Sequence, residues 1–155
     1  MRWGRRNAAL LCRRAGDDGQ VVTVEVDPRI ADAARVALSN AGYHPEVVTA
    51  DGLHGCPARA PYDRVISTAA VRDVVPPAWL EQLSSGGRLV TPWDTDWHGV
   101  LLTLHVGENG DATGRFHSDL GLYAYPLSAG SAILLATRQQ HDQASTAQHH
   151  RVSRH

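Results

Sequence analysis

The fold is predicted most clearly by residues 21–28, Val21-Val22-Thr23-Val24-Glu25-Val26-Asp27-Pro28. Its strand-like part, residues 21–26, is almost wholly β-branched, and such an apolar run is typical of a parallel strand buried on both faces. Asp27 then predicts a helix N-cap and Pro28 the first helical position, because a capping carboxylate accepts a backbone N–H and proline offers none. A buried strand that runs directly into a helix predicts an α/β fold.

The same alternation continues on both sides of this stretch. The expected elements are a helix over 7–15, the strand over 21–26, a helix from 28 closed by Gly42, strands over 46–50 and 64–67, a helix over 76–83, a turn over 84–87 and a strand over 88–91. From residue 99 the pattern becomes a hairpin, with strands over 100–106 and 112–117 around a turn. The order predicts an open, mostly parallel sheet with an antiparallel C-terminal edge.

The overall composition favours one ordinary globular domain. The chain has 155 residues and a formal net charge of -1. This charge disfavours nonspecific electrostatic binding to nucleic acid or to an anionic membrane. No apolar run reaches the roughly 20 residues that span a bilayer, and two cysteines make no disulfide framework. We expect a cytoplasmic protein with a domain over 1–138 and a disordered, polar, His-rich tail over 139–155.

Ligands of open α/β sheets bind outside the carboxyl ends of the strands, which makes Glu25 and Val26 the first candidate positions. A carboxylate at the end of such a strand can accept from both hydroxyls of a ribose. The alternative for Glu25 is a solvated strand end, and we interpret Asp27 as a helix cap only.

Two further stretches end strands in the same way. Asp51 can accept from an exocyclic amine while the backbone at Gly52 and Leu53 approaches a ring nitrogen, although Asp-Gly is also a common turn signal. Thr68 lies among the small residues 67–70, which either admit a ligand close to the backbone or simply pack.

A glycine-rich turn should precede Glu25 by about 20 residues, and the sequence contains no G-x-G at all. That spacing leads back to residues 1–5, where a basic Met-Arg-Trp-Gly-Arg segment stands instead. The absence disfavours an oxidoreductase that uses a nicotinamide cofactor.

An ordered set of motifs resembles the core of the protein-L-isoaspartate O-methyltransferases, which are class I S-adenosylmethionine-dependent enzymes. The motifs lie at 7–11, 21–27, 51–52, 61–66, 76–83 and 86–90, and segments 91–93 and 111–116 resemble actinobacterial members. The resemblance implies a Rossmann-like sheet and S-adenosyl-L-methionine as cofactor. It implies that Glu25 binds the ribose and that Asp51, with Gly52 and Leu53, holds the adenine.

The family carries its first strand, its glycine-rich turn and a hydroxyl-bearing substrate loop ahead of the positions matched here. We therefore expect an N-terminally truncated chain or a misassigned start, with no catalytic residue to name. The first strand is central in this fold, so strands 21–26 and 64–67 are expected to expose unpaired edges. This chain as written is then expected to be less stable than a complete member and to bind the cofactor weakly or not at all.

The leading hypothesis is methyl transfer to a carboxylate of a protein or peptide that carries isoaspartate or aspartate. The alternative is a remnant or interaction module that binds no cofactor. The histidines of the tail, His141, His149, His150 and His155, suggest either a metal site or a solvated segment, and we favour the solvated segment.

Overall fold

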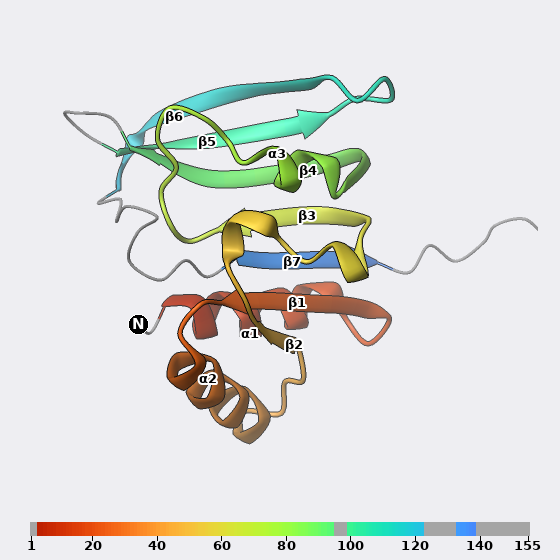
Figure 1. The fold of residues 1–155 in the computed structure, drawn as a ribbon, viewed down its shortest axis with the longest axis vertical. Coiled ribbons are helices and arrows are strands. Elements are labelled where there is room, and N and C mark those ends of the chain that lie inside the picture. The colour runs from red at the N-terminus through yellow and green to blue at the C-terminus, as the bar shows by residue number, and fades with distance from the viewer. Residues whose placement is uncertain (1–2, 95–98, 123–132, 139–155) are drawn as a thin grey trace, which may run out of the picture.

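The computed structural model describes residues 3–94, 99–122 and 133–138, which form a layered α/β structure (Figure 1). The predicted tail over 139–155, with its histidines, lies outside the described residues. The helices are α1 (Trp3–Ala15), α2 (Pro28–Asn40) and α3 (Pro77–Glu81), with 3₁₀ turns η1 (Gly52–His54) and η2 (Pro57–Arg59). The strands are β1 (Gly19–Glu25), β2 (Glu46–Thr49), β3 (Tyr62–Ser67), β4 (Leu83–Asp94), β5 (Gly99–Val106), β6 (Ala112–Leu122) and β7 (Ile133–Arg138).

The strands form one seven-stranded sheet in the order β2-β1-β7-β3-β4-β5-β6. Strands β1 and β2 pair in parallel, as do β3 and β4. Strands β4, β5 and β6 follow one another antiparallel, with Leu89 opposite Leu104 and Leu104 opposite Gly114. The predicted α/β class and the antiparallel C-terminal edge are therefore confirmed.

The centre of the sheet differs from the expectation. Strand β7 runs antiparallel between β1 and β3, and its first residue, Ile133, lies opposite both Val24 and Ser67. The prediction that these two strands expose unpaired edges is therefore wrong. Buried backbone N–H and C=O groups must find partners, and the last strand of the chain supplies them on both sides.

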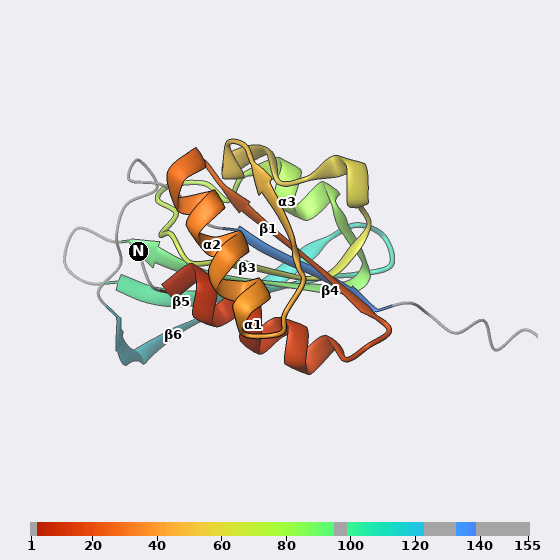
Figure 2. The ribbon, with the colours of Figure 1, turned by 90° about the horizontal axis from the view of Figure 1, so that it is seen from below.

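Helices cover both faces of the sheet, with α1 and α3 on opposite sides (Figure 2). Helix α1 packs against β1, β7 and α2, where Ala8, Ala34 and Leu38 form one apolar cluster. Helix α3 packs on β4 and η1 over a second cluster that contains Tyr62 and Trp79. The candidate site therefore stands on strands that are buried from both faces.

Several element boundaries differ from the prediction. Helix α1 begins at Trp3 instead of residue 7, and the predicted turn over 84–87 lies within β4, where the register with β3 shifts. In α2, Ala31 and Ala34 are buried, whereas Ala33 is exposed, as is Ala41 just after the helix. Periodicity located the helix, and the helix's orientation on the sheet decided which alanines became buried.

Candidate functional site

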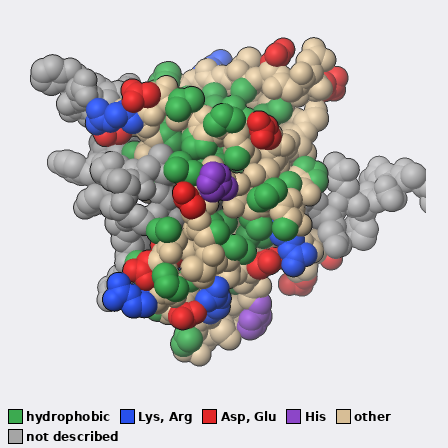
Figure 3. All heavy atoms as spheres, viewed as in Figure 1, with side chains coloured by type: hydrophobic (Ala, Val, Ile, Leu, Met, Phe, Trp, Pro, Cys, Tyr) green, Lys and Arg blue, Asp and Glu red, His purple; other side chains and the backbone are tan. Residues whose placement is uncertain are grey.

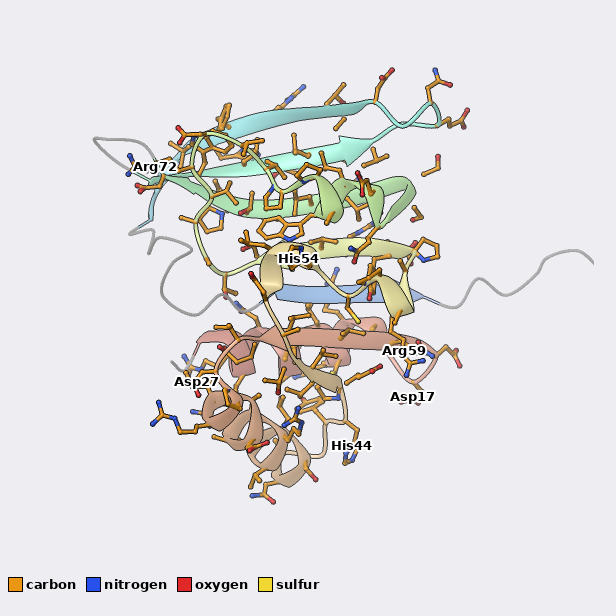
Figure 4. The ribbon with its side chains drawn as sticks, viewed as in Figure 1. Asp17, Asp27, His44, His54, Arg59 and Arg72 are labelled. Carbon is orange, nitrogen blue, oxygen red and sulfur yellow. The ribbon has the colours of Figure 1, made fainter. Side chains whose placement is uncertain are left out.

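The carboxyl ends of β1, β2 and β3 lie at one edge of the sheet, because β1 is parallel to β2 and both β1 and β3 are antiparallel to β7. All the predicted site residues follow these strand ends. Figure 4 shows Asp27 and Arg72 on the side where β1 and β3 end, with Asp17 and Arg59 on the opposite side. This is the edge where open α/β sheets bind ligands.

Glu25 is the last residue of β1 and is only 7% exposed. Its Oε1 accepts a hydrogen bond from the backbone N–H of Asp27 at 3.2 Å. Among the described residues, no buried side-chain nitrogen or oxygen lacks a partner. The second carboxylate oxygen of Glu25 has no partner among the described groups, so it is not fully buried and can accept from a ligand hydroxyl.

Asp27 is a helix cap, as predicted. Its Oδ1 accepts from the backbone N–H of Arg29 at 2.8 Å, and its Oδ2 pairs with the Arg29 guanidinium at 3.2 Å. Hydrogen bonds from the Arg29 side chain and backbone hold the pKa of Asp27 below its usual range. Both oxygens of this carboxylate are thus occupied within the first turn of α2. The side chain of Val26, between the two carboxylates, is exposed.

Asp51 lies beside the end of β1, because the backbone N–H of Ala50 donates to the carbonyl of Glu25 at 3.1 Å. Asp51 caps η1 through a bond from the Leu53 N–H to its Oδ1 at 2.9 Å. The Leu53 amide, expected to reach a ring nitrogen, is therefore already paired with Asp51. Only the second oxygen of Asp51 has no described partner.

The end of β3 turns sharply after Ser67, whose hydroxyl donates to the Ala69 carbonyl at 2.7 Å and accepts from the Ala69 N–H at 3.2 Å. Thr68 lies in this turn. Because β7 separates β1 from β3, Thr68 lies about 10 Å from the β1 end, two strand spacings away. The structure thus places Glu25 and Asp51 on neighbouring strands and Thr68 farther along the edge.

A buried polar network, which the sequence did not reveal, holds η1 and η2 in place. Gln82 accepts from the Cys56 N–H at 2.9 Å through Oε1 and donates to the His54 carbonyl at 2.8 Å through Nε2. The Tyr62 hydroxyl donates to the Cys56 carbonyl at 2.6 Å. The pKa of Tyr62 is raised, mainly because the hydroxyl is buried and also because of this hydrogen bond. These partners lie up to 28 residues apart, so no local motif could have indicated them.

Gly55 should tolerate no side chain in this network. Its φ is +61°, and a Cβ there would lie 2.5 Å from Gln82 Oε1. We expect Gly55→Ala to destabilise the protein by about 1–3 kcal/mol, from backbone strain and displacement of Gln82. Gly86→Ala is the matched control, because Gly86 has a φ of +75° with nothing within 4 Å of a Cβ. Urea unfolding should show the larger loss at Gly55, and equal losses would contradict a packing role for Gln82.

Charge and thiol chemistry offer no competing site within the described part of the chain. On the face seen in Figure 3, arginine side chains lie apart from one another among acidic ones. Residues 3–94, 99–122 and 133–138 contain no group of three or more His, Cys, Asp or Glu side chains that could hold a metal ion.

Cys12 and Cys56 are free thiols, and burial raises the pKa of Cys12. None of the described helices has the length and apolar character needed to cross a membrane.

The fold, with carboxylates at the ends of two neighbouring parallel strands, defines the class as an open α/β protein with a nucleotide-type ligand edge. The family model described as Protein-L-isoaspartate(D-aspartate) O-methyltransferase (PCMT) matches residues 5–119. The chain belongs to this family, as the resemblance implied.

Relatives and solved structures agree with this assignment. The chain is 39% identical over 113 residues to the protein-L-isoaspartate O-methyltransferase of Methanopyrus kandleri, covering 72% of this chain and 50% of the relative. It is 42% identical over 108 residues to that of Methanococcoides burtonii, covering 69% and 52%. The chain therefore spans about half the length of these curated relatives. Both are archaeal, so the resemblance to the actinobacterial type of the family stays a prediction.

A solved protein-L-isoaspartate O-methyltransferase matches 77% of this chain and 38% of its own, with a TM-score of 0.69 and 28% identity. A second structure, from Plasmodium falciparum, is in complex with S-adenosyl-L-homocysteine. It covers 68% of this chain and 51% of its own with a TM-score of 0.54, and at 13% identity it shows the fold alone.

Proposed function

We propose that the edge formed by Glu25 and Asp51 binds the nucleoside part of S-adenosyl-L-methionine and that the protein transfers a methyl group to a carboxylate of a protein or peptide, of the isoaspartyl type. The observation that carries the proposal is the buried Glu25 at the end of β1 with one carboxylate oxygen accessible. Family membership and a fold neighbour bound to S-adenosyl-L-homocysteine support the choice of ligand.

The residues present fit the nucleoside. A ribose offers hydroxyl donors, and the open oxygen of Glu25 is an acceptor at the strand end. The unpaired oxygen of Asp51 can accept from the exocyclic amine of adenine, and the Trp79 Nε1–H fixes the adjacent backbone through a 2.9 Å bond to the Gly52 carbonyl. Val26, Gly52, Leu53 and Thr68 remain proposed contacts at the same edge.

The proposed chemistry asks little of the protein beyond positioning. The cofactor would supply an electrophilic methyl group, and a substrate carboxylate is already ionised near neutral pH. No base is needed, so holding the two reactants in line would account for most of the rate. This agrees with the lack of an acid–base dyad at the described strand ends.

The proposed substrate is a protein or peptide that carries isoaspartate or aspartate. We propose the cytoplasm as its compartment, because both cysteines are free thiols, as is usual in reducing environments.

One observation favours a non-catalytic alternative. The described edge offers acceptors for a ribose and an adenine, but β7 enters between β1 and β3 in the antiparallel direction. Among the described strands, none therefore ends between Glu25 and Thr68 to present a turn to the rest of the cofactor. An interaction module that binds no cofactor is the second candidate function.

Replacing Glu25 by alanine should weaken binding of S-adenosyl-L-homocysteine tenfold or more. A charge-assisted hydrogen bond contributes about 1.5–3 kcal/mol, and about 1.4 kcal/mol corresponds to a factor of ten. Isothermal titration measures this, with the 155-residue chain at a concentration high enough to detect the weak binding that we expect of it. The control is Glu46→Ala, because Glu46 begins β2 at the opposite edge and pairs with Arg59. If the unsubstituted protein gives no heat of binding, the interaction module that binds no cofactor is favoured. If Glu25→Ala binds as tightly as the unsubstituted protein, Glu25 is not part of the site.

A further inference from the structure

The turn that follows Asp51 is held by one buried side chain, Gln82, which comes from the end of α3. Gln82 is 7% exposed and is the C-cap residue of α3. Its Oε1 accepts from the Cys56 N–H at 2.9 Å, and its Nε2 donates to the His54 carbonyl at 2.8 Å. A side-chain amide presents an acceptor and a donor together, which neither a carboxylate nor an apolar side chain does. Gln82 therefore satisfies two backbone groups of the turn at once.

Gln82 is itself fixed by elements outside this turn. Its backbone N–H donates to the Ala78 carbonyl at 3.2 Å, and its carbonyl accepts from the Tyr62 N–H at 2.8 Å. Its side chain lies so close to Gly55 that a Cβ on that glycine would be 2.5 Å from Oε1. The end of α3 and the start of β3 thus set the position of the amide, and the amide sets the position of the turn.

The turn passes this constraint on to Asp51. The His54 N–H donates to the Asp51 carbonyl at 3.2 Å, and the Leu53 N–H donates to Asp51 Oδ1 at 2.9 Å. These bonds fix the backbone of Asp51 and the rotation of its carboxylate relative to His54, whose carbonyl Gln82 holds. The second oxygen of Asp51, which has no described partner, keeps one position for as long as Gln82 holds the turn.

We propose that Gln82 is a positioning residue that makes the nucleoside site selective for adenine. The inference rests on the proposed function, in which the second oxygen of Asp51 accepts from the exocyclic amine of adenine. A hydrogen bond weakens steeply when its distance or angle is poor. The preference for a purine that carries this amine therefore depends on where the turn places Asp51, and Gln82 sets that placement without touching the ligand.

A pair of nucleosides that differ by one group tests this role. Adenosine and purine riboside share the ribose and the ring, and only adenosine has the exocyclic amine. Because a charge-assisted hydrogen bond is lost with that amine, we expect the unsubstituted chain to prefer adenosine about tenfold. The two affinities are measured by NMR titration of the full chain with millimolar nucleoside.

Replacing Gln82 by methionine keeps the length of the side chain and removes both hydrogen bonds to the turn. We expect the preference for adenosine to shrink severalfold in Gln82→Met, because Asp51 is no longer held in place. The affinity for purine riboside should change little, because the ribose contact at Glu25 does not depend on the turn. A loss of stability alone would instead leave the ratio of the two affinities unchanged.

Leu38→Ala is the control for lost stability. Leu38 is buried in the separate cluster that also contains Ala8 and Ala34, so its truncation destabilises the protein without touching the turn. Its preference for adenosine should equal that of the unsubstituted protein. If Gln82→Met does not fold, Gln82→Glu replaces it, because a carboxylate keeps the acceptor for Cys56 and loses the donor to His54. We expect an intermediate preference for that variant.

The outcomes separate this inference from the proposed function. If the Gln82 variant keeps the full preference for adenosine, the positioning role is overturned and the proposed nucleoside site stands. If the unsubstituted protein binds both nucleosides equally, Asp51 does not accept from the amine and the positioning role is overturned as well. If the unsubstituted protein binds neither nucleoside, the proposed function itself fails, and the role of Gln82 fails with it.

Discussion

Replacing Trp79 by alanine should destabilise the protein by about 3–5 kcal/mol, the usual loss for a large aromatic side chain removed from a core. Trp79 is 0% exposed and belongs to the cluster that fills the space between α3 and the sheet. Its Nε1 also donates to the Gly52 carbonyl at 2.9 Å. The alanine variant loses the packing and leaves that carbonyl without its partner. Urea unfolding followed by circular dichroism measures the loss.

Trp79→Phe separates the two contributions, because phenylalanine keeps most of the ring volume and removes the N–H donor. An orphaned buried acceptor costs about 1–3 kcal/mol, so we expect the phenylalanine variant to lie between the native protein and the alanine variant. It should also loosen η1 and weaken binding at Asp51 if the proposed nucleoside site is correct. A loss below about 1 kcal/mol in Trp79→Ala would contradict the packing described for α3.

Replacing Leu135 by proline should have an effect of similar or greater size, because it acts on the centre of the sheet. Leu135 lies opposite Val22 on β1 and opposite Val65 on β3. Proline removes the backbone N–H and is tolerated in sheets only at edges or bulges. We expect the free energy of unfolding to fall by about 4–5 kcal/mol or more, which is exceptional for one substitution. A loss of this size is a large part of the stability of a typical domain.

The matched control is Leu135→Val, which keeps the backbone N–H and suits a strand. Thermal unfolding should show a lowered or lost cooperative transition for the proline variant and a nearly unchanged one for valine. If the proline and valine variants have the same unfolding temperature, β7 does not lie between β1 and β3 in solution. Strands β1 and β3 would then expose unpaired edges, as the sequence had suggested.

Much of the fold was predictable because short, local stretches of sequence specify its helices, strands and turns. The β-branched run over 21–26 forms β1, and Asp27 and Pro28 begin α2 as cap and first residue. Gly16 and Gly42 follow the ends of their helices with φ of +74° and +79°. Strand alternation and the 107–111 turn located the C-terminal hairpin. These signals lie within a few residues of the elements that they specify.

The candidate site was predictable to the same extent. The position of Glu25 and Asp51 at neighbouring strand ends follows from the strands themselves, and the structure places both there. The pairing of the Leu53 amide with Asp51 and the support of Gly52 by Trp79 were not predictable. Trp79 lies 27 residues from Gly52, and no periodicity relates them.

Local sequence patterns were sufficient to predict the α/β class, the order of the elements and the carboxylates at their ends, because propensity and capping act over a few residues. The strand in the middle of the sheet was not predictable in this way, because its place depends on contacts between distant parts of the chain. Residues 133–138 carry no local sign that they pair with β1 and β3, which end far earlier in the chain, at Glu25 and Ser67. Their place is set by the requirement that two buried strands satisfy their backbone groups, and this requirement exists only after the sheet has assembled.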